Sequence, residues 1–173
     1  ESEHLQGTRG GYRLVTPIER LAVPASVQAV LAARIDRLAE REKQVLQTAA
    51  VIGKEFSEPV LVQVLAEVAP RNARPADLSA ALRTLAQAEF VYEQALYPVA
   101  EYAFKHPLTQ QVAYDTLLRE RRVRVHAAVA RATAAIYAEK IDEKAALLAH
   151  HYEQAGEAWQ AALWHQRAAE WAG

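Results

Sequence analysis

His106 has the setting in this sequence that is best suited to chemistry. It lies in Phe104-Lys105-His106-Pro107-Leu108, where a β-prone run ends and a helical pattern begins at Pro107. The residues that share one side of the predicted helix are Leu108, Val112, Ala113, Thr116 and Leu117. His106 is thereby placed at a helix N-terminus, where unpaired backbone N–H groups and the helix dipole favour an anion such as phosphate.

The other reactive side chains form no catalytic pattern. The chain contains no cysteine, which excludes disulfides, thiolate chemistry and cysteine–zinc sites. None of its serines lies in a Gly-x-Ser-x-Gly elbow; they are Ser2, Ser26, Ser57 and Ser79. Gly53-Lys54 resembles the end of a phosphate-binding loop, but Thr48 and Glu55 replace its first glycine and its magnesium-binding hydroxyl. We therefore expect no enzymatic activity within these residues.

The remaining histidines predict no metal site. His150 and His151 are adjacent, so on a helix they point about 100° apart. No second histidine lies four residues from either of them, which is the spacing of a helical zinc pair. His4, His126 and His165 are isolated along the sequence, and each is interpreted as a packed or solvated residue.

Composition indicates an ordinary globular module. The chain has 173 residues, of which 51% are hydrophobic, enough for one larger domain or two small ones. It starts with Glu1 and contains no methionine, so we expect it to be a piece of a longer protein. The sequence shows no apolar run of about 18 residues and no leader, so we expect a cytoplasmic location and no membrane partner.

Residues 1–24 are predicted to be a connector. They are rich in glycine and polar residues, with two short β-prone runs at 12–15 and 18–23 broken by Pro17. The pair Gly10-Gly11 is interpreted as turn punctuation rather than as a phosphate loop.

Residues 25–105 carry helical patterns followed by a hairpin pattern. Apolar residues recur at helical spacing in four segments: from Ser26 to Leu38, over about 40–52, after Ser57, and from Leu78 to Phe90. Ser26 and Ser57 are expected to cap the first and third helices, and Gly53 to end the second. Two strands, 91–94 and 101–104, flank a turn near Pro98. The sequence thus predicts a mainly α fold, with a winged-helix-like domain and a small β-hairpin wing at 25–105.

The rest of the chain is predicted to be helical throughout. Residues 106–138 form linking helices, the second with Val125, Val129, Ala132 and Ile136 on its buried side. Residues 139–173 are similar to the start of a tetratricopeptide-like antiparallel segment. The positions that carry this spacing are Ala145, Leu148, Ala149, Tyr152, Ala161 and Ala168. One such repeat cannot bury its own face, so further repeats are expected to follow.

Two further groups of residues have alternative interpretations. The run Arg119–Arg124 is interpreted as a solvated helix face with local ion pairs, or as a site for phosphates or acidic partners. Trp159, Trp164 and Trp171 are interpreted as packing within or between repeats, or as a binding platform.

The arrangement of hairpin, Phe-Lys-His and helix, between a small helical domain and a tetratricopeptide-like pair, resembles the segment behind the nucleotide-binding domain of STAND signalling ATPases. The likeness extends to bacterial proteins that join such an ATPase to a class III adenylate or guanylate cyclase domain, or to a DNA-binding output domain. In that superfamily a winged-helix Met-His-Asp signature contacts the phosphate of ADP through its histidine. Lys105, His106 and Pro107 stand at the matching positions, so the histidine alone is retained.

The resemblance implies a regulatory and interaction module that couples nucleotide state to an output domain of a signal-transduction ATPase. No cofactor is implied within the segment; ATP or ADP would be bound by the parent protein, with His106 and the adjacent Lys105 as candidate phosphate contacts. The implied partners are the neighbouring nucleotide-binding domain of the same chain and proteins that bind the helical repeats. The alternative for His106 is that it only caps the turn before its helix.

A winged helix commonly binds DNA, so the charge of the helix before the wing matters. That helix offers Arg83 beside Asp77 and Glu89, which makes it a poor reader of base edges. The net charge of −1 supplies no overall basic field to attract nucleic acid. DNA is therefore not the expected partner, and a winged-helix transcriptional regulator with a helical effector domain is kept as the alternative function.

Overall fold

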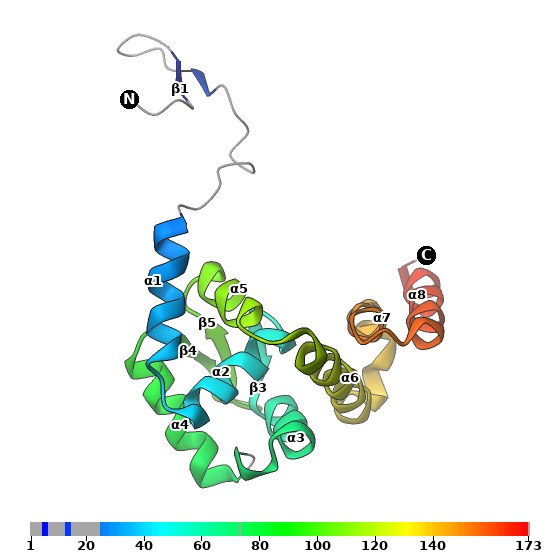
Figure 1. Cartoon of the computed structure of the whole chain (residues 1–173). Coiled ribbons are helices and arrows are strands. Elements are labelled where there is room, and N and C mark those ends of the chain that lie inside the picture. The colour runs from blue at the N-terminus through cyan, green and yellow to red at the C-terminus, as the bar shows by residue number, and fades with distance from the viewer. Residues whose placement is uncertain (1–4, 7–12, 15–24, 73, 173) are drawn as a thin grey trace.

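The described part of the chain is mainly helical. The computed structural model describes residues 5–6, 13–14, 25–72 and 74–172, which form eight α-helices and a three-stranded antiparallel sheet (Figure 1). A separate two-stranded pair joins β1 (Leu5–Gln6) to β2 (Arg13–Leu14). Most of the predicted connector 1–24, including its glycines and its second β-prone run, lies outside the described residues.

Two helices open the described body of the molecule. Helix α1 (Ala25–Asp36) contains Ser26 inside its first turn, so the prediction that Ser26 caps this helix was wrong. Only part of its apolar side is buried: Ile35 lies in the core, whereas Val30 is 60% exposed. Helix α2 (Glu40–Ile52) has the predicted bounds and is buried over every residue from Val45 to Val51.

A short strand that the sequence analysis missed follows helix α2. Gly53 ends the helix as expected, but with φ at 154° rather than in the usual left-handed helical region. Strand β3 (Glu55–Ser57) then leads into helix α3 (Glu58–Val68). Ser57 occupies the N-cap position of α3 without making the predicted capping bond; its hydroxyl lies 3.4 Å from the hydroxyl of Tyr137.

The sheet combines this missed strand with the predicted hairpin. After the turn η2 (Pro70–Asn72) and helix α4 (Pro75–Gln87), strands β4 (Val91–Ala95) and β5 (Glu101–Phe104) pair as expected. Strand β3 pairs with the other side of β5, so the order across the sheet is β3-β5-β4. Three residues are too few to show a strand periodicity, and the partner of β3 lies far along the chain.

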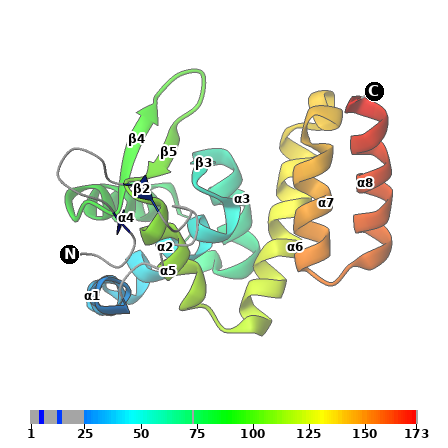
Figure 2. The ribbon, with the colours of Figure 1, turned by 90° about the horizontal axis from the view of Figure 1, so that it is seen from above.

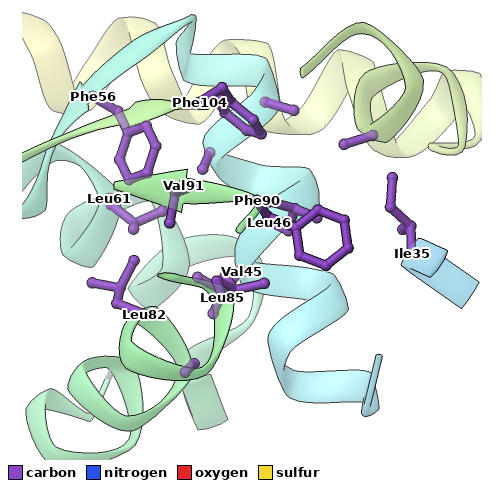
Figure 3. Close-up of a cluster of buried hydrophobic side chains, with 14 of the residues drawn as sticks. Ile35, Val45, Leu46, Phe56, Leu61, Leu82, Leu85, Phe90, Val91 and Phe104 are labelled. Atoms are coloured by element: carbon purple, nitrogen blue, oxygen red, sulfur yellow. The ribbon is translucent and has the colours of Figure 1, made fainter. Parts of the chain in front are cut away.

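Helices α1 to α5 and the sheet share one hydrophobic core (Figure 3). Leu46 from α2, Leu61 from α3, Leu82 and Leu85 from α4, and Phe104 from β5 converge there. Helix α5 (Pro107–Asp115) forms as its helical pattern predicted, but it adds Val112 and Ala113 to this core, although the sequence analysis placed it among linking helices outside the domain of 25–105. Burying such aliphatic and aromatic side chains is the main favourable contribution to folding.

The C-terminal helices lie side by side at one end of the molecule (Figure 2). They are α6 (Arg119–Ile136), α7 (Ala145–Gln154) and α8 (Ala158–Ala172), with a 3₁₀ segment, η3 (Ala138–Lys144), between the first two. No helix in the described part of the chain is both long and apolar enough to cross a membrane.

Most of the residues predicted to face inward in this end are buried. Val125, Val129 and Ala132 of α6 are buried against α3, whereas Ile136 at the end of the helix is 37% exposed. The buried positions of the tetratricopeptide-like spacing are Ala145, Leu148, Ala149, Tyr152 and Ala161. Trp164 is buried with these residues in one hydrophobic cluster. Trp159 and Trp171 are exposed on α8, so they do not pack within the described residues.

A left-handed glycine makes the turn between α7 and α8. Gly156 has φ at 75°, its N–H donates to the carbonyl of Glu153 (3.0 Å), and the N–H of Glu157 donates to the carbonyl of Tyr152 (2.9 Å). These two bonds are the Schellman ending of a helix, which favours glycine at this position. A Cβ added to Gly156 would meet no atom within 4 Å, so only its backbone conformation opposes a side chain.

We predict that Gly156→Ala lowers the free energy of unfolding by about 1–2 kcal/mol, because the left-handed conformation is strained for an alanine. Gly156→Asn should cost less, since asparagine tolerates this conformation better than alanine. Urea denaturation followed by tryptophan fluorescence measures both changes, as all three tryptophans lie in α8. Equal stability of the alanine variant and the original protein would contradict the assignment of the turn.

Candidate functional site

The two residues singled out from the sequence lie in the turn between β5 and α5. Both Lys105 and His106 are exposed. His106 occupies the N-cap position of α5 with extended backbone, and its carbonyl accepts the N–H of Thr109 (2.9 Å). Its imidazole makes no capping hydrogen bond, so the backbone alone begins the helix. The side chain of His106 is thus available to a ligand or partner.

Lys105 is already paired with an acidic residue. Its ammonium nitrogen lies 2.5 Å from a carboxylate oxygen of Glu89, which lies two residues after the end of α4. This hydrogen bond and the positive charge of Lys105 lower the pKa of the Glu89 carboxyl, with smaller contributions from Arg34 and His106. A phosphate approaching His106 would therefore meet a lysine whose charge is compensated, together with a nearby carboxylate.

The backbone of Glu89 is strained. It is the non-glycine residue with a positive φ, 60°, among the described residues. The N–H of Phe90 donates to the carbonyl of Leu85 and the N–H of Glu89 to that of Ala86, both at 3.0 Å, so α4 ends in the same way as α7. A side chain in this conformation costs free energy that a glycine would not. The strain is local to the residue that pairs with Lys105.

A second group of residues, which sequence reasoning missed, lies at the contact between α6 and α7. His126 and His151 are 2% and 1% exposed, and their Nδ1 atoms lie 2.9 Å apart. The hydroxyl of Tyr114 lies 3.0 Å from Nε2 of His126. The ring of His150 packs edge-on against both imidazoles, with centroids 5.9 Å from His126 and 5.4 Å from His151. We call these four residues the histidine cluster.

His126 is thus a packed residue, one of the two predicted alternatives, but its contact with other histidines was not predicted. The neighbouring pair behaved as predicted, because His151 points into the protein and His150 is exposed. The one available signal was spacing: His126 shares a side of α6 with Ala130 and Thr133, four and seven residues on, both of which are buried. That spacing indicates a closely approached helix face, but it does not identify the residue across the contact.

Hydrogen-bond chemistry limits the protonation of the cluster. The short contact between the two Nδ1 atoms needs one imidazole to donate and the other to accept. Nε2 of His151 is buried and has no hydrogen-bond partner. An unpaired lone pair costs less there than an unpaired N–H, so we assign the proton of His151 to Nδ1. Nδ1 of His126 then accepts, and its Nε2–H donates to the Tyr114 hydroxyl oxygen.

Both buried imidazoles are held neutral. Burial is the main cause that lowers the pKa of His126 to about 4, aided by the charges of His150 and Arg122. Burial likewise lowers the pKa of His151 to about 3, aided by His126 and His150. Removing a charged imidazole from water is unfavourable unless a counter-charge accompanies it, and no carboxylate pairs with either ring among the described contacts.

Two open recesses adjoin the cluster. One, of about 370 Å³, is lined by Gln110, Gln154 and His150. The other, of about 400 Å³, is lined by Arg122 and Glu153, and His126 contributes to both. No group of three or more His, Cys, Asp or Glu side chains is placed to hold a metal ion within the described residues.

Comparison with protein families, with curated proteins and with solved structures found no match to this chain. The likeness to signalling ATPases therefore rests on Phe104-Lys105-His106 and on the repeat spacing in the sequence. The inferences below draw on the order of the elements, the charge of their exposed faces and the contacts of the two histidine sites.

We predict that diethylpyrocarbonate modifies the histidines of the folded protein in two groups at neutral pH. His106, His150 and His165 should react readily because they are exposed. His126 and His151 should stay protected because neither ring is open to the reagent. Site-resolved mass spectrometry measures the modification, and the same reaction in urea is the control in which the protection disappears. Rapid modification of His126 in the folded protein would contradict its burial.

Proposed function

We propose that this chain is a regulatory and protein-interaction segment of a signalling ATPase, built from a winged-helix domain and a tetratricopeptide-like helix pair. The observation that supports this proposal most is the order of the elements, α2-β3-α3-α4-β4-β5, together with the strand order β3-β5-β4 across the sheet. In a winged helix, a short strand after the first helix completes the sheet of the two-stranded wing in this way. The antiparallel pair α7–α8, with alanines at its contact, supports the repeat assignment.

The exposed faces of this domain favour protein over DNA as the partner. Helix α4 would be the recognition helix, and Arg83 is its one basic residue. The wing, residues 91–104, contains Glu93 and Glu101 but no lysine or arginine. Its tip instead exposes Leu96 and Tyr97, at 70% and 89%. The carboxylates of the two strands repel phosphate, and the exposed apolar tip favours contact with another protein.

In the proposed role, His106 senses the nucleotide that the neighbouring domain binds. Its exposed imidazole, at the start of α5, donates a hydrogen bond to a phosphate oxygen of ADP and holds the segment closed over the nucleotide. Lys105 approaches the same phosphate only after its pair with Glu89 opens. His106 thus supplies binding free energy to one state of the switch and takes no part in chemistry.

We predict that His106→Ala, in the ATPase that contains this segment, weakens ADP binding by about tenfold or more, the effect of one hydrogen bond to a charged group. Glu89→Gln should strengthen ADP binding, because it frees Lys105 and removes a negative charge from the site. The ADP that co-purifies with the protein and its dissociation constant measure both effects.

His165→Ala is the matched control, since His165 is also exposed but lies on α8. It should leave ADP binding unchanged. If His106→Ala behaves like this control, the sensor role is wrong; if Glu89→Gln also has no effect, nucleotide does not reach this turn.

The winged-helix order also favours one alternative, a DNA-binding transcriptional regulator with a helical effector domain. We predict no binding of this chain to a short random-sequence duplex in fluorescence polarisation at about 50 mM salt, where non-specific binding is favoured. Salt-sensitive binding that Arg83→Ala weakens would support the alternative and overturn the protein-interaction role.

A further inference from the structure

The helix pair α7–α8 is attached to the rest of the protein chiefly through α6 and η3. Its other described contacts with the body formed by α1 to α5 are few, and the pair stands at the edge of the molecule (Figure 2). The cluster that joins it to α6 is small on the α6 side, where the buried Ala130 and the partly buried Ala134 contribute. Alanines allow close approach but bury little apolar surface, so the polar residues at this contact weigh heavily in its stability.

The polar residues at the centre of the contact are His126 and His151. Each belongs to a different helix, and the Nδ1···Nδ1 bond of 2.9 Å spans the contact directly. When both rings are neutral, one N–H and one lone pair fit together. When both rings are protonated, two N–H groups and two positive charges face each other at the same place, and the bond cannot form.

No described neighbour compensates those charges. From α5 the cluster is faced by the Tyr114 hydroxyl, from α6 by Arg122, and from α7 by His150. Glu153 of α7 lines the recess beside His126, but its recorded contact is with His165 on α8 (3.9 Å). Helix α2 contributes Ala50 and Val51 to the other recess, neither of which titrates. Asp115 of α5 lies 4.0 Å from Arg122, and neither it nor Glu153 is hydrogen-bonded to an imidazole. Protonation therefore adds positive charge at a place where no carboxylate pairs with either ring.

We propose that the His126–His151 contact is a pH-sensitive catch, which holds α7–α8 against α6 at neutral pH and releases the helix pair in mild acid. Release gives both imidazoles access to water and lets each ring donate two hydrogen bonds to it. The body formed by α1 to α5 has its own core, which does not include either histidine, so it stays folded when the pair swings away. The proposal does not depend on the role in an ATPase.

The direction of the pH effect follows from linkage. The pKa of each ring is lower in the docked state, about 4 for His126 and about 3 for His151, than the ordinary value of 6.5 regained on release. The stability of docking is therefore complete above pH 6.5 and is lost as the pH falls towards 4. Over that interval release takes up two protons, so its equilibrium constant rises by about a hundredfold per pH unit.

The absence of cysteine allows a direct measurement. Gln63→Cys on α3 and Ala162→Cys on α8 are both exposed positions, and spin labels on this pair report the distance between the body and α8 by pulsed electron paramagnetic resonance. We expect one narrow distance distribution at pH 7.5 and a second, longer or broader one that grows below pH 6. Far-ultraviolet circular dichroism on the same samples should show that the helices persist.

Three variants in the labelled background test the assignment. His106→Leu is the matched control, because it removes an exposed histidine that lies outside the histidine cluster, and it should keep the transition near its original pH. His151→Leu should shift the transition to lower pH and make it shallower, since His126 alone remains to be protonated. The double variant His126→Phe/His151→Leu should show no transition down to pH 5.

An unchanged wild-type distance distribution between pH 7.5 and 4.5 would overturn the proposal, and so would loss of all helical signal together with the distance change. A transition that His106→Leu abolishes would also overturn it. If the double variant fails to fold at pH 7.5, the comparison of wild type with His151→Leu decides, because an identical midpoint in the two proteins contradicts the catch.

Discussion

The burial of α2 on all sides is the constraint on which the rest of the structure depends. Seven successive residues of this helix, Val45 to Val51, are buried, so it has no solvent face along that stretch. A helix of this kind is stable only when other elements surround it. Helices α3, α4, α5 and α6 provide that cover, and each must turn an apolar side towards α2. The polar residue Gln47 is tolerated there because its amide donates to the hydroxyl of Thr116 (2.9 Å).

Helix α6 transmits that constraint to the C-terminal end. One of its sides packs Val125 and Val129 against α3, and another presents His126 and Ala130 to α7. The hydrophobic residues form three clusters: one shared by α1 to α5 and the sheet, one between α3 and α6, and one shared by α6, α7 and α8. These clusters follow one another along the molecule, and no described cluster joins α8 directly to the sheet. The contacts within the first two clusters are apolar and involve no histidine. The third has a hydrogen bond between two imidazoles at its centre, so it is the contact whose stability depends on protonation.

The two histidine sites differ because their surroundings differ. His106 lies in solvent at a turn, where its chemistry is set by whatever approaches it, and where the Lys105–Glu89 pair already balances the local charge. His126 and His151 are buried and pair with no carboxylate among the described contacts, so burial holds both rings neutral. The strained residue Glu89 pairs with Lys105, the residue next to His106.

The sequence by itself determined the helices, the hairpin and most of the buried residues. Leu78, Leu82 and Leu85 recur at the period of a helix, and a turn near Pro98 separates the two strands of the hairpin, so neighbouring residues carry the information. Only the tertiary structure decided the third strand, the ion pair of Lys105 and the pairing of His126 with His151. Each of these joins segments that are distant in the chain, and a pKa depends on what surrounds a group once it is buried. Local periodicity shows that a side chain faces inward, but it does not say which residue it will meet there.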